Sequence, residues 1–483
     1  MVFSSVIFLW VLLPVILGCY YLSPRSFRNG LLMVFSLFFY AWGEPGYIVL
    51  MVFSVLLNFS FGIWIETAEK KKGLLALCVA CNLLILGYFK YSGFLIETIN
   101  SMLAGTGREL PAVAVSLPIG ISFYTFQALS YVVDVYRGEN RAQRNLVNMM
   151  LYISFFPQLI AGPIVKYHEI EAQIENRTVT AEDFSCGVKR FILGLGKKVI
   201  LANSFAEVVD AVWAYPAGRV SAPLLWMTAL LYMLQIYFDF SGYSDMAIGL
   251  GRMFGFTFQE NFRLPYTASS VRDFWRKWHI SLSGWFREYV YIPLGGNRKG
   301  TARTYLNLGI VFLLTGIWHG AGWTFLFWGL YHGCFLILER ALPGTGSGTG
   351  VCQAAKGGQR KQSGCVRWCL AHLYTLAVVY FGWIFFRADT MGSAADFLRN
   401  MFLPHAPVIF LERFLDRKLS LLLLTGLGAC GPLPWLWKKW KGRGLAEDGE
   451  ITVPAMAGYL LVLWLSLLLL VNNTYNPFIY FRF

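Results

Sequence analysis

Runs of apolar residues recur along the whole chain of 483 residues and are separated mainly by short polar loops. The first, MVFSSVIFLWVLLPVILGCY, has no basic start and no small-residue cleavage site, so we expect a retained span and not a signal peptide. Further runs follow at roughly 31–42, 47–65, 73–89 and 112–134. Because a helix needs about 20 residues to cross the hydrocarbon core of a bilayer, this pattern predicts an all-α polytopic membrane protein.

The composition supports the same class. Only 14% of the residues are charged and 56% are hydrophobic, whereas about 25% of the residues in an ordinary soluble domain are charged. This excludes a soluble enzyme, a disordered protein and a nucleic-acid binder. The net charge of +14 is explained by Lys and Arg in cytoplasmic loops. Cys78 and Cys81 have CxxC spacing inside an apolar run, so we expect neither a disulfide nor a metal site there.

The orientation follows from the loops that carry basic residues. The first, third and fifth connections contain eight of them, whereas the loops between contain only Lys90 and Arg108. The eight are Arg25, Arg28, Lys70, Lys71, Lys72, Arg137, Arg141 and Arg144. Cytoplasmic loops are enriched in Lys and Arg, so we expect the N-terminus outside.

The middle of the chain departs from regular crossings. The run 149–162 is short and contains Pro157, and the basic segment 163–204 that follows is again typical of the cytoplasm. A helix that enters the membrane and returns fits this pattern better than a full crossing. Non-helical backbone at membrane depth is tolerated only where protein or a water-filled cavity covers it, so the chain is expected to surround a cavity.

His319 lies in the middle of the apolar run 305–338. As one helix this run would be about 51 Å long, which exceeds the thickness of a bilayer. Gly316, Gly320 and Gly322 are the expected positions of a break, which favours a hairpin that returns to the cytoplasm over one strongly tilted helix. An ionisable side chain at this depth is a functional candidate by default. The alternative is a neutral histidine bonded to a neighbouring carbonyl.

The segment 255–304 is polar, aromatic and basic although it lies between strongly apolar runs. On one helix, residues 272–287 would form a polar stripe about 80° wide next to an aromatic face. The stripe contains Arg272, Arg276, His279, Ser283 and Arg287, and the aromatic face contains Trp275, Trp278, Leu282 and Trp285. Such a helix either lies at the membrane interface or turns its cationic stripe toward a polar cavity, and only the second arrangement explains the histidine.

Two carboxylates and the remaining histidines complete the candidates. Asp239 and Asp245 are expected to be counter-ions of the arginines or helix caps, with capping favoured for Asp245. His332 is expected to be structural, and no role is expected for His168, His372 and His405. The chain has no GxSxG nucleophile elbow and no HExxH zinc pair. Two histidines without a serine or cysteine nucleophile leave general-base chemistry on a bound hydroxyl.

Several motifs make the chain resemble the membrane-bound O-acyltransferases, and within them the bacterial alginate O-acetyltransferase branch. They are YFDFSGYSDMAIGLGRMFGF at 237–256, NFRLPY at 261–266, RDFWRKWHISLSGWFREYVYIPLGGNR at 272–298 and TGIWHGAGWTFLFWGLYHG at 315–333. The resemblance covers nearly the whole chain. The D-alanyl transfer proteins of teichoic acid are the nearest alternative within the same family.

The resemblance implies one transmembrane domain over 1–483, a ring of roughly 10–12 transmembrane helices plus re-entrant or interfacial helices around a central funnel. It places a catalytic core at 255–340, followed by a flexible cytoplasmic loop at 341–366. It implies His319 as the general base and His279 as the second catalytic histidine. Candidate donor- or substrate-binding residues are Arg272, Arg276, Trp278, Ser283, Trp318 and Asp239.

By the same resemblance, an acyl group, acetyl in this branch, moves from a cytoplasmic thioester to hydroxyls of an exported polysaccharide. The donor substrate is acetyl-CoA or an acyl-carrier thioester, and no bound cofactor or metal is expected. The implied location is the bacterial inner membrane, beside a separate extracytoplasmic SGNH-type acetyltransferase. D-alanyl transfer to teichoic acid and, in another class, a transporter of polysaccharide or lipid intermediates are the alternatives. A transporter often carries internal repeats, and this chain shows none.

Overall fold

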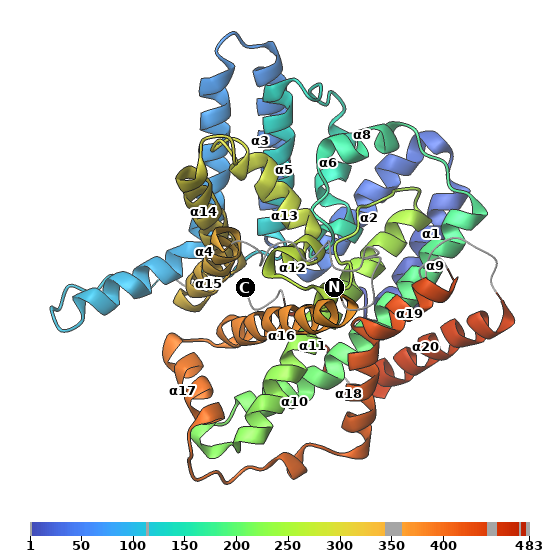
Figure 1. The fold of residues 1–483 in the computed structure, drawn as a ribbon. Helices are drawn as coiled ribbons and strands as arrows, with labels where there is room; N and C mark the ends of the chain where they lie inside the picture. Colours follow the sequence, from blue (N-terminus) through green and yellow to red (C-terminus); the bar gives the residue numbers. More distant parts are fainter. Residues whose placement is uncertain (1, 113–114, 343–359, 442–451, 473–474, 480–483) are drawn as a thin grey trace. The chain divides into compact units, whose positions relative to one another are not determined.

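The computed structural model describes residues 2–112, 115–342, 360–441, 452–472 and 475–479, which fold almost entirely as helices (Figure 1). Within these ranges the only β-type pairing is an isolated bridge between Val220 and Ile409. The chain forms two compact units. Unit 1 comprises Met1–Leu195, Tyr243–Gln259 and Asp448–Thr474, and unit 2 comprises Gly196–Gly242, Glu260–Glu447 and Tyr475–Phe483.

Unit 1 contains the N-terminal helices, the end of α11, and α20. Its helices are α1 (Leu13–Leu22), α2 (Arg28–Gly43), α3 (Ile48–Thr67), α4 (Lys71–Leu103), α5 (Ile121–Arg137), α6 (Leu146–Ser154), α7 (Phe156–Leu159), α8 (Tyr167–Glu175), α9 (Ala181–Gly196) and α20 (Val453–Asn472). Helix α5 is buried along most of its length and packs against α3 and α4. It begins after Gly120 and ends before Gly138, and both glycines adopt the left-handed conformation, which glycine reaches without a steric penalty. At Gly138 this conformation ends the helix.

Unit 2 contains the second half of the chain. Its helices are α10 (Asn203–Trp213), most of α11 (Ala222–Met253), α12 (Val271–Lys277), α13 (Ile280–Phe286), α14 (Thr301–His319), α15 (Trp323–Ala341), α16 (Arg360–Arg387), α17 (Met391–Phe402), α18 (Arg417–Ala429) and α19 (Pro432–Lys441). A π-helical turn, Lys197–Ala202, precedes α10, and another, Arg287–Tyr291, follows α13.

Five helices in the described part of the chain are long and apolar enough to cross a membrane. They are Ile48–Thr67, Lys71–Leu103, Ala222–Met253, Val366–Arg387 and Val453–Asn472. Side chains of α20 are mostly exposed although its sequence is strongly apolar, which is expected of a helix in contact with lipid. The prediction of an all-α polytopic membrane protein is confirmed. The ring of 10–12 helices and the central funnel stay predictions.

The run 149–162 forms parts of two short buried helices, α6 and α7, which meet at Phe155. At nine residues α6 is about 13 Å long, so it cannot cross a bilayer. The predicted loop 341–366 needs a correction at both ends. Ala341 still belongs to α15, and residues 360–366 already belong to α16, whereas 343–359 lie outside the described residues.

The run 305–338 is broken into a helical hairpin, so the single tilted helix is wrong. Helix α14 ends at His319, the extended residues Gly320 and Gly322 bound the turn, and α15 starts at Trp323. Gly316 stays helical instead of breaking the chain. It faces Gly329 of α15, and a Cβ at Gly316 would lie 3.2 Å from the Gly329 Cα. The two glycines therefore let the backbones of the hairpin approach closely.

Candidate active site

His319 is the last residue of α14 and is 4% exposed, within unit 2. Three aromatic rings surround its imidazole, with centroid distances of 5.0 Å to Trp318, 5.0 Å to Trp328 and 5.2 Å to Phe386. The imidazole thus lies at a helix end in an aromatic enclosure and next to a glycine turn. This places the histidine where the sequence predicted irregular backbone.

His279 lies close to His319, with 6.3 Å between their ring centroids. It is fully buried, and burial lowers the pKa of its imidazole to about 3, so the ring is neutral near pH 7. Its backbone is left-handed, with φ of 44°. A non-glycine residue in this conformation costs about 1–3 kcal/mol and persists only where its surroundings hold it. The two predicted histidines therefore do come together in the fold.

The predicted continuous helix over 272–287 is wrong, because the chain breaks at Trp278 and His279 between α12 and α13. The break separates the histidine from the arginines. Arg276 is exposed, Arg272 is half-buried, and His279 is fully buried. The tryptophans of the aromatic face are also buried within the protein and do not lie in an acyl boundary. Trp278 packs between Phe274 and Trp383 at 5.5 and 4.9 Å.

Glu339 of α15 holds the start of α12, a contact that no motif or spacing in the sequence indicates. Its carboxylate accepts hydrogen bonds from the backbone N–H of Val271 at 2.6 Å and of Arg272 at 3.1 Å. These N–H groups belong to the first turn of a helix and have no partner within it. Ser283, in α13, donates a 3.4 Å hydrogen bond to the Trp275 carbonyl. It therefore links α13 to α12.

Asp239 forms a buried ion pair with Lys198 and is not a counter-ion of the predicted arginines. The Lys198 Nζ lies 2.5 Å from the Asp239 carboxylate, and both side chains are 3% exposed. The second carboxylate oxygen accepts the Ile479 N–H at 2.8 Å, and the ammonium of Lys198 also bonds to the Pro477 carbonyl. The ion pair thus anchors the segment 475–479. The sequence does not mark Lys198 as the partner of a buried carboxylate. It lies in the basic segment 163–204, which predicts only a cytoplasmic location.

Asp245 lies inside α11 and is not a helix cap. Its carboxylate accepts hydrogen bonds from the Arg190 guanidinium at 2.8 and 3.0 Å, both within unit 1. His332 is fully buried among Trp275, Trp328 and Tyr331, with ring centroids 5.2–5.3 Å apart. The structural role of His332 stays a prediction.

A polar cavity of about 170 Å³ adjoins the turn that follows His319. Ala321, Gly322 and Phe325 contribute from the hairpin, and Phe386 lines the cavity while also contacting the His319 ring. Its polar lining is Asp210, Tyr232, Gln235, Thr324, Arg387 and Asp389. Arg387 bonds to Asp210 at 2.7 Å. No described residue bonds to the Arg387 Nε or the Gln235 Oε1, although both side chains are more than nine-tenths buried.

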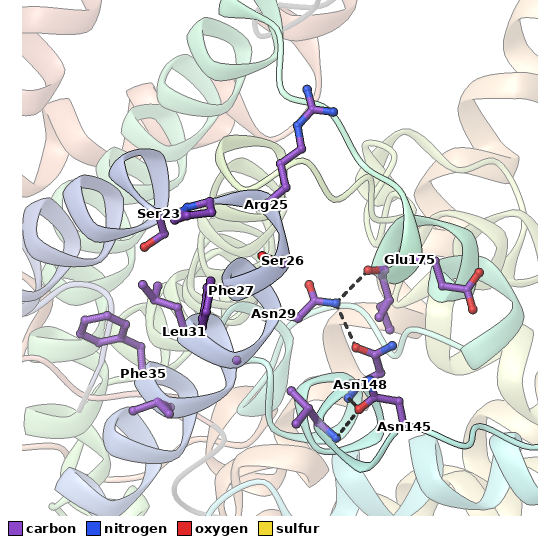
Figure 2. Close-up of a pocket in the computed structure, with 15 residues that line it drawn as sticks. Ser23, Arg25, Ser26, Phe27, Asn29, Leu31, Phe35, Asn145, Asn148 and Glu175 are labelled. Carbon is purple, nitrogen blue, oxygen red and sulfur yellow. Dashed lines mark hydrogen bonds between the residues drawn. The ribbon is translucent and has the colours of Figure 1, made fainter.

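Unit 1 has a larger and more open cavity of about 870 Å³, shown in Figure 2. It lies between the start of α2 and the residues Asn145, Asn148 and Glu175. Asn29 donates hydrogen bonds of 2.9 Å to the Asn148 side chain and to the Ile174 carbonyl there. None of the predicted site residues lines this cavity.

One group of possible metal ligands exists among the described residues, and it lies in unit 1. The ligand atoms of Asp134, Glu139 and His168 are within 4.8 Å of one another. His168 Nδ1 and the buried Asp134 carboxylate are 3.1 Å apart, so these two groups already satisfy each other. Neither predicted catalytic histidine belongs to the group.

The sequence model of the membrane-bound O-acyltransferase family matches residues 136–343, which include both predicted catalytic histidines, His279 and His319. The chain is 41% identical over its full length to the probable alginate O-acetylase of Pseudomonas putida, which it also covers completely. It is 35% identical to the peptidoglycan O-acetyltransferase of Helicobacter pylori, over 83% of this chain and 80% of the relative. The teichoic acid D-alanyltransferase of Bacillus subtilis is 29% identical over 46% of this chain and 60% of its own.

The fold and these relatives define a multi-pass membrane enzyme of the acyltransferase class. The chain belongs to the membrane-bound O-acyltransferase family. Its similarity to alginate O-acetylases and a peptidoglycan O-acetyltransferase supports an O-acetyltransferase. The predicted resemblance is confirmed, with the D-alanyltransferases as more distant relatives.

Proposed function

We propose that the protein transfers an acetyl group from a cytoplasmic thioester to hydroxyl groups of an exported polysaccharide, with His319 as the general base. The proposal is carried by one arrangement: two buried histidines 6.3 Å apart, one of which adjoins a polar cavity. The names of the relatives support a polysaccharide acceptor, alginate or peptidoglycan.

The polar cavity is proposed to receive the acceptor. Helices α14 and α15 have basic residues at the ends remote from His319, namely Arg303 and Arg340. Helix α16 also begins in a basic segment and ends at Arg387, which lines the cavity. Because basic segments favour the cytoplasm, the cavity end of these helices is expected to face away from it. Unbonded polar atoms of Gln235 and Arg387 could bond to sugar hydroxyls.

In this mechanism His319 removes the proton of an acceptor hydroxyl as its oxygen attacks the thioester carbonyl. The carbon–sulfur bond then breaks, and the donor leaves as a thiol after taking up a proton. A positioned general base contributes about 10²–10⁴-fold to such a step. His279 orients the thioester or stabilises charge. Trp318 contacts the rings of both histidines, and Trp278 and Trp318 contribute to the binding of the donor. Arg272 and Arg276 bind the phosphates of coenzyme A or, alternatively, lipid headgroups.

The cellular setting is proposed from the resemblance alone. It is the bacterial inner membrane, with the N-terminus outside. A separate extracytoplasmic SGNH-type acetyltransferase would be the partner that receives or uses the acyl group. The donor is acetyl-CoA, with an acyl-carrier thioester as the alternative. Neither substrate is a resident cofactor.

Thiol release from acetyl-CoA tests the proposal directly. Purified protein in liposomes would be assayed with and without the host's polysaccharide, as wild type and as His319→Ala. We expect release that needs the acceptor and falls by about 10²-fold or more in His319→Ala. His332→Ala is the matched control, because it removes another buried imidazole for which no catalytic role is proposed.

The outcomes separate the alternatives. Equal release by wild type and His319→Ala would contradict the general-base role. Release from an acyl carrier but not from acetyl-CoA would favour the D-alanyl type of donor. An absence of release from both donors, with transport of an intact polysaccharide intermediate, would favour the transporter.

A further inference from the structure

Asn261 contacts three consecutive residues at the start of α13. Its side-chain Oδ1 accepts hydrogen bonds from the Ser281 backbone N–H at 3.2 Å and from the Ser281 hydroxyl at 2.9 Å. Its main-chain carbonyl accepts the Ile280 N–H at 3.0 Å. The same Oδ1 lies 3.2 Å from Nδ1 of His279. All of these groups belong to unit 2, and the side chains of Asn261, His279 and Ser281 are fully buried.

These contacts determine which nitrogen of His279 carries the proton. A backbone N–H can only donate, so the Asn261 atom that faces Ser281 N must be the amide oxygen and not the amide nitrogen. An oxygen can only accept, and therefore the His279 Nδ1 beside it must carry a hydrogen. A neutral imidazole has one N–H, and burial keeps this ring neutral. Nε2 consequently carries a lone pair and no hydrogen.

Nε2 of His279 is buried, and no described residue hydrogen-bonds to it. The ring is enclosed by Phe240, Trp318 and His319, at centroid distances of 4.6, 5.8 and 6.3 Å. His279 does not line the polar cavity beside His319. A buried acceptor atom without a protein partner calls for a specific explanation, and a ligand that donates a hydrogen bond would supply one.

We propose that Asn261 is a positioning residue that holds His279 in the Nδ1–H tautomer, so that Nε2 accepts a hydrogen bond from the thioester donor. This inference rests on the proposed function and decides between the two roles given there for His279. A neutral Nε2 without hydrogen orients a donor and cannot stabilise a negative charge by donating to it. The matching donor groups are the amide N–H groups of the pantetheine arm, which coenzyme A and acyl carriers share.

The tautomer can be measured without any assay of activity. Histidine labelled with ¹⁵N on the ring gives distinct solid-state NMR shifts for protonated and unprotonated nitrogens. The signals of His279 are identified by their loss in His279→Gln. We expect a protonated Nδ1 and an unprotonated Nε2 in the wild type. A protonated Nε2 at neutral pH would overturn the proposal even if the protein transfers acetyl groups as proposed.

Substitutions at Asn261 test the consequence for transfer from acetyl-CoA. Asn261→Ala removes the acceptor, so we expect transfer at least about 10-fold slower and a mixed tautomer, as for other groups that orient a histidine. Asn261→Asp keeps an acceptor oxygen and is expected to retain the tautomer and to restore transfer to within about 10-fold of wild type. Ser281→Ala is the matched control, because it removes another hydrogen bond to the same oxygen.

The combination of results distinguishes positioning from stability. Wild-type transfer by Asn261→Ala with an altered tautomer would overturn the proposal. Equal loss in Asn261→Ala, Asn261→Asp and Ser281→Ala would show a structural role only and would also overturn it. If Asn261→Ala does not fold, the tautomer seen in the wild-type spectrum and the transfer rate of Asn261→Asp still test the proposal. Failure of the wild type to release thiol from any donor would instead contradict the proposed function and leave the tautomer measurement valid.

Discussion

Lys198 and Asp239 show how much a single buried pair decides at the residue scale. The pair lies in the interior of unit 2, and its remaining contacts are with Pro477 and Ile479. Removing one partner of a buried ion pair leaves an uncompensated charge, whereas replacing both by apolar residues of similar volume is often nearly neutral. The pair thus holds the C-terminal segment in place without necessarily adding net stability.

We therefore expect Asp239→Ala to destabilise the protein by about 3–5 kcal/mol. The double variant Lys198→Met with Asp239→Leu should lose clearly less, because no charge is left unpaired. Thermal unfolding in detergent measures both, and limited proteolysis reports whether the C-terminal segment is released. Asp396→Ala, at an exposed carboxylate, serves as the control. An unfolding midpoint of Asp239→Ala equal to that of the control would refute the anchoring role.

At the scale of elements, the hairpin of α14 and α15 positions His319. Its two helices approach through Gly316 and Gly329, where a side chain would meet the opposing backbone. Backbone, unlike the end of a flexible side chain, cannot move aside cheaply. The position of His319 relative to Trp328 of α15 therefore depends on a close helix–helix contact and not on the histidine itself.

Gly316→Ala should separate the two helices and cost about 1–3 kcal/mol, the usual range for overpacking. We also expect the protein that remains folded to transfer acetyl groups more slowly, since His319 follows Gly316 by one helical turn. Gly309→Ala is the matched control in the same helix, because nothing lies within 4 Å of the added Cβ. The unfolding midpoint and the specific activity would be measured for both variants. Similar values for the two would contradict the role of the close contact between Gly316 and Gly329.

At the scale of the whole molecule, the direction of transfer depends on which loops face the cytoplasm. The orientation predicted from the basic loops is the one that the proposed cytoplasmic donor requires. The five span-length helices show that the chain crosses the membrane, but length and apolarity carry no direction. The predicted side therefore rests on the asymmetry of Lys and Arg between alternate loops.

We expect a cysteine in place of Lys71 to be protected from an impermeant maleimide in right-side-out vesicles, and a cysteine in place of Arg108 to react. Both positions lie at the surface of unit 1, so protection would reflect the membrane and not burial. The unmodified chain measures the background labelling of its own cysteines. The reverse pattern would place the N-terminus inside and would contradict the proposed route from cytoplasmic donor to external acceptor.

The sequence by itself determined the class of the protein, the break at the glycines and the two histidines, His279 and His319, that the fold brings together. These features are local, since long apolar runs, glycine turns and short motifs are legible without knowing what packs against them. The predictions from the sequence are wrong where a residue's hydrogen-bond or ion-pair partner lies far away along the chain. Asn261 bonds to Ile280 and Ser281 where the helix predicted over 272–287 breaks, and a left-handed His279 has no signature in helical periodicity.

The tertiary structure alone assigned the partners of the charges. Asp239 meets Lys198 and Asp245 meets Arg190, because packing brings these helices together, while the predicted arginines lie nearer the surface. The direction of the hydrogen bonds that sets the tautomer of His279 likewise follows only from the relative positions of three groups. They are the His279 ring, the Asn261 amide and the Ser281 N–H. Apolar pattern selects which segments are buried, but it does not specify which buried polar groups face one another, and that is where the chemistry of this site is decided.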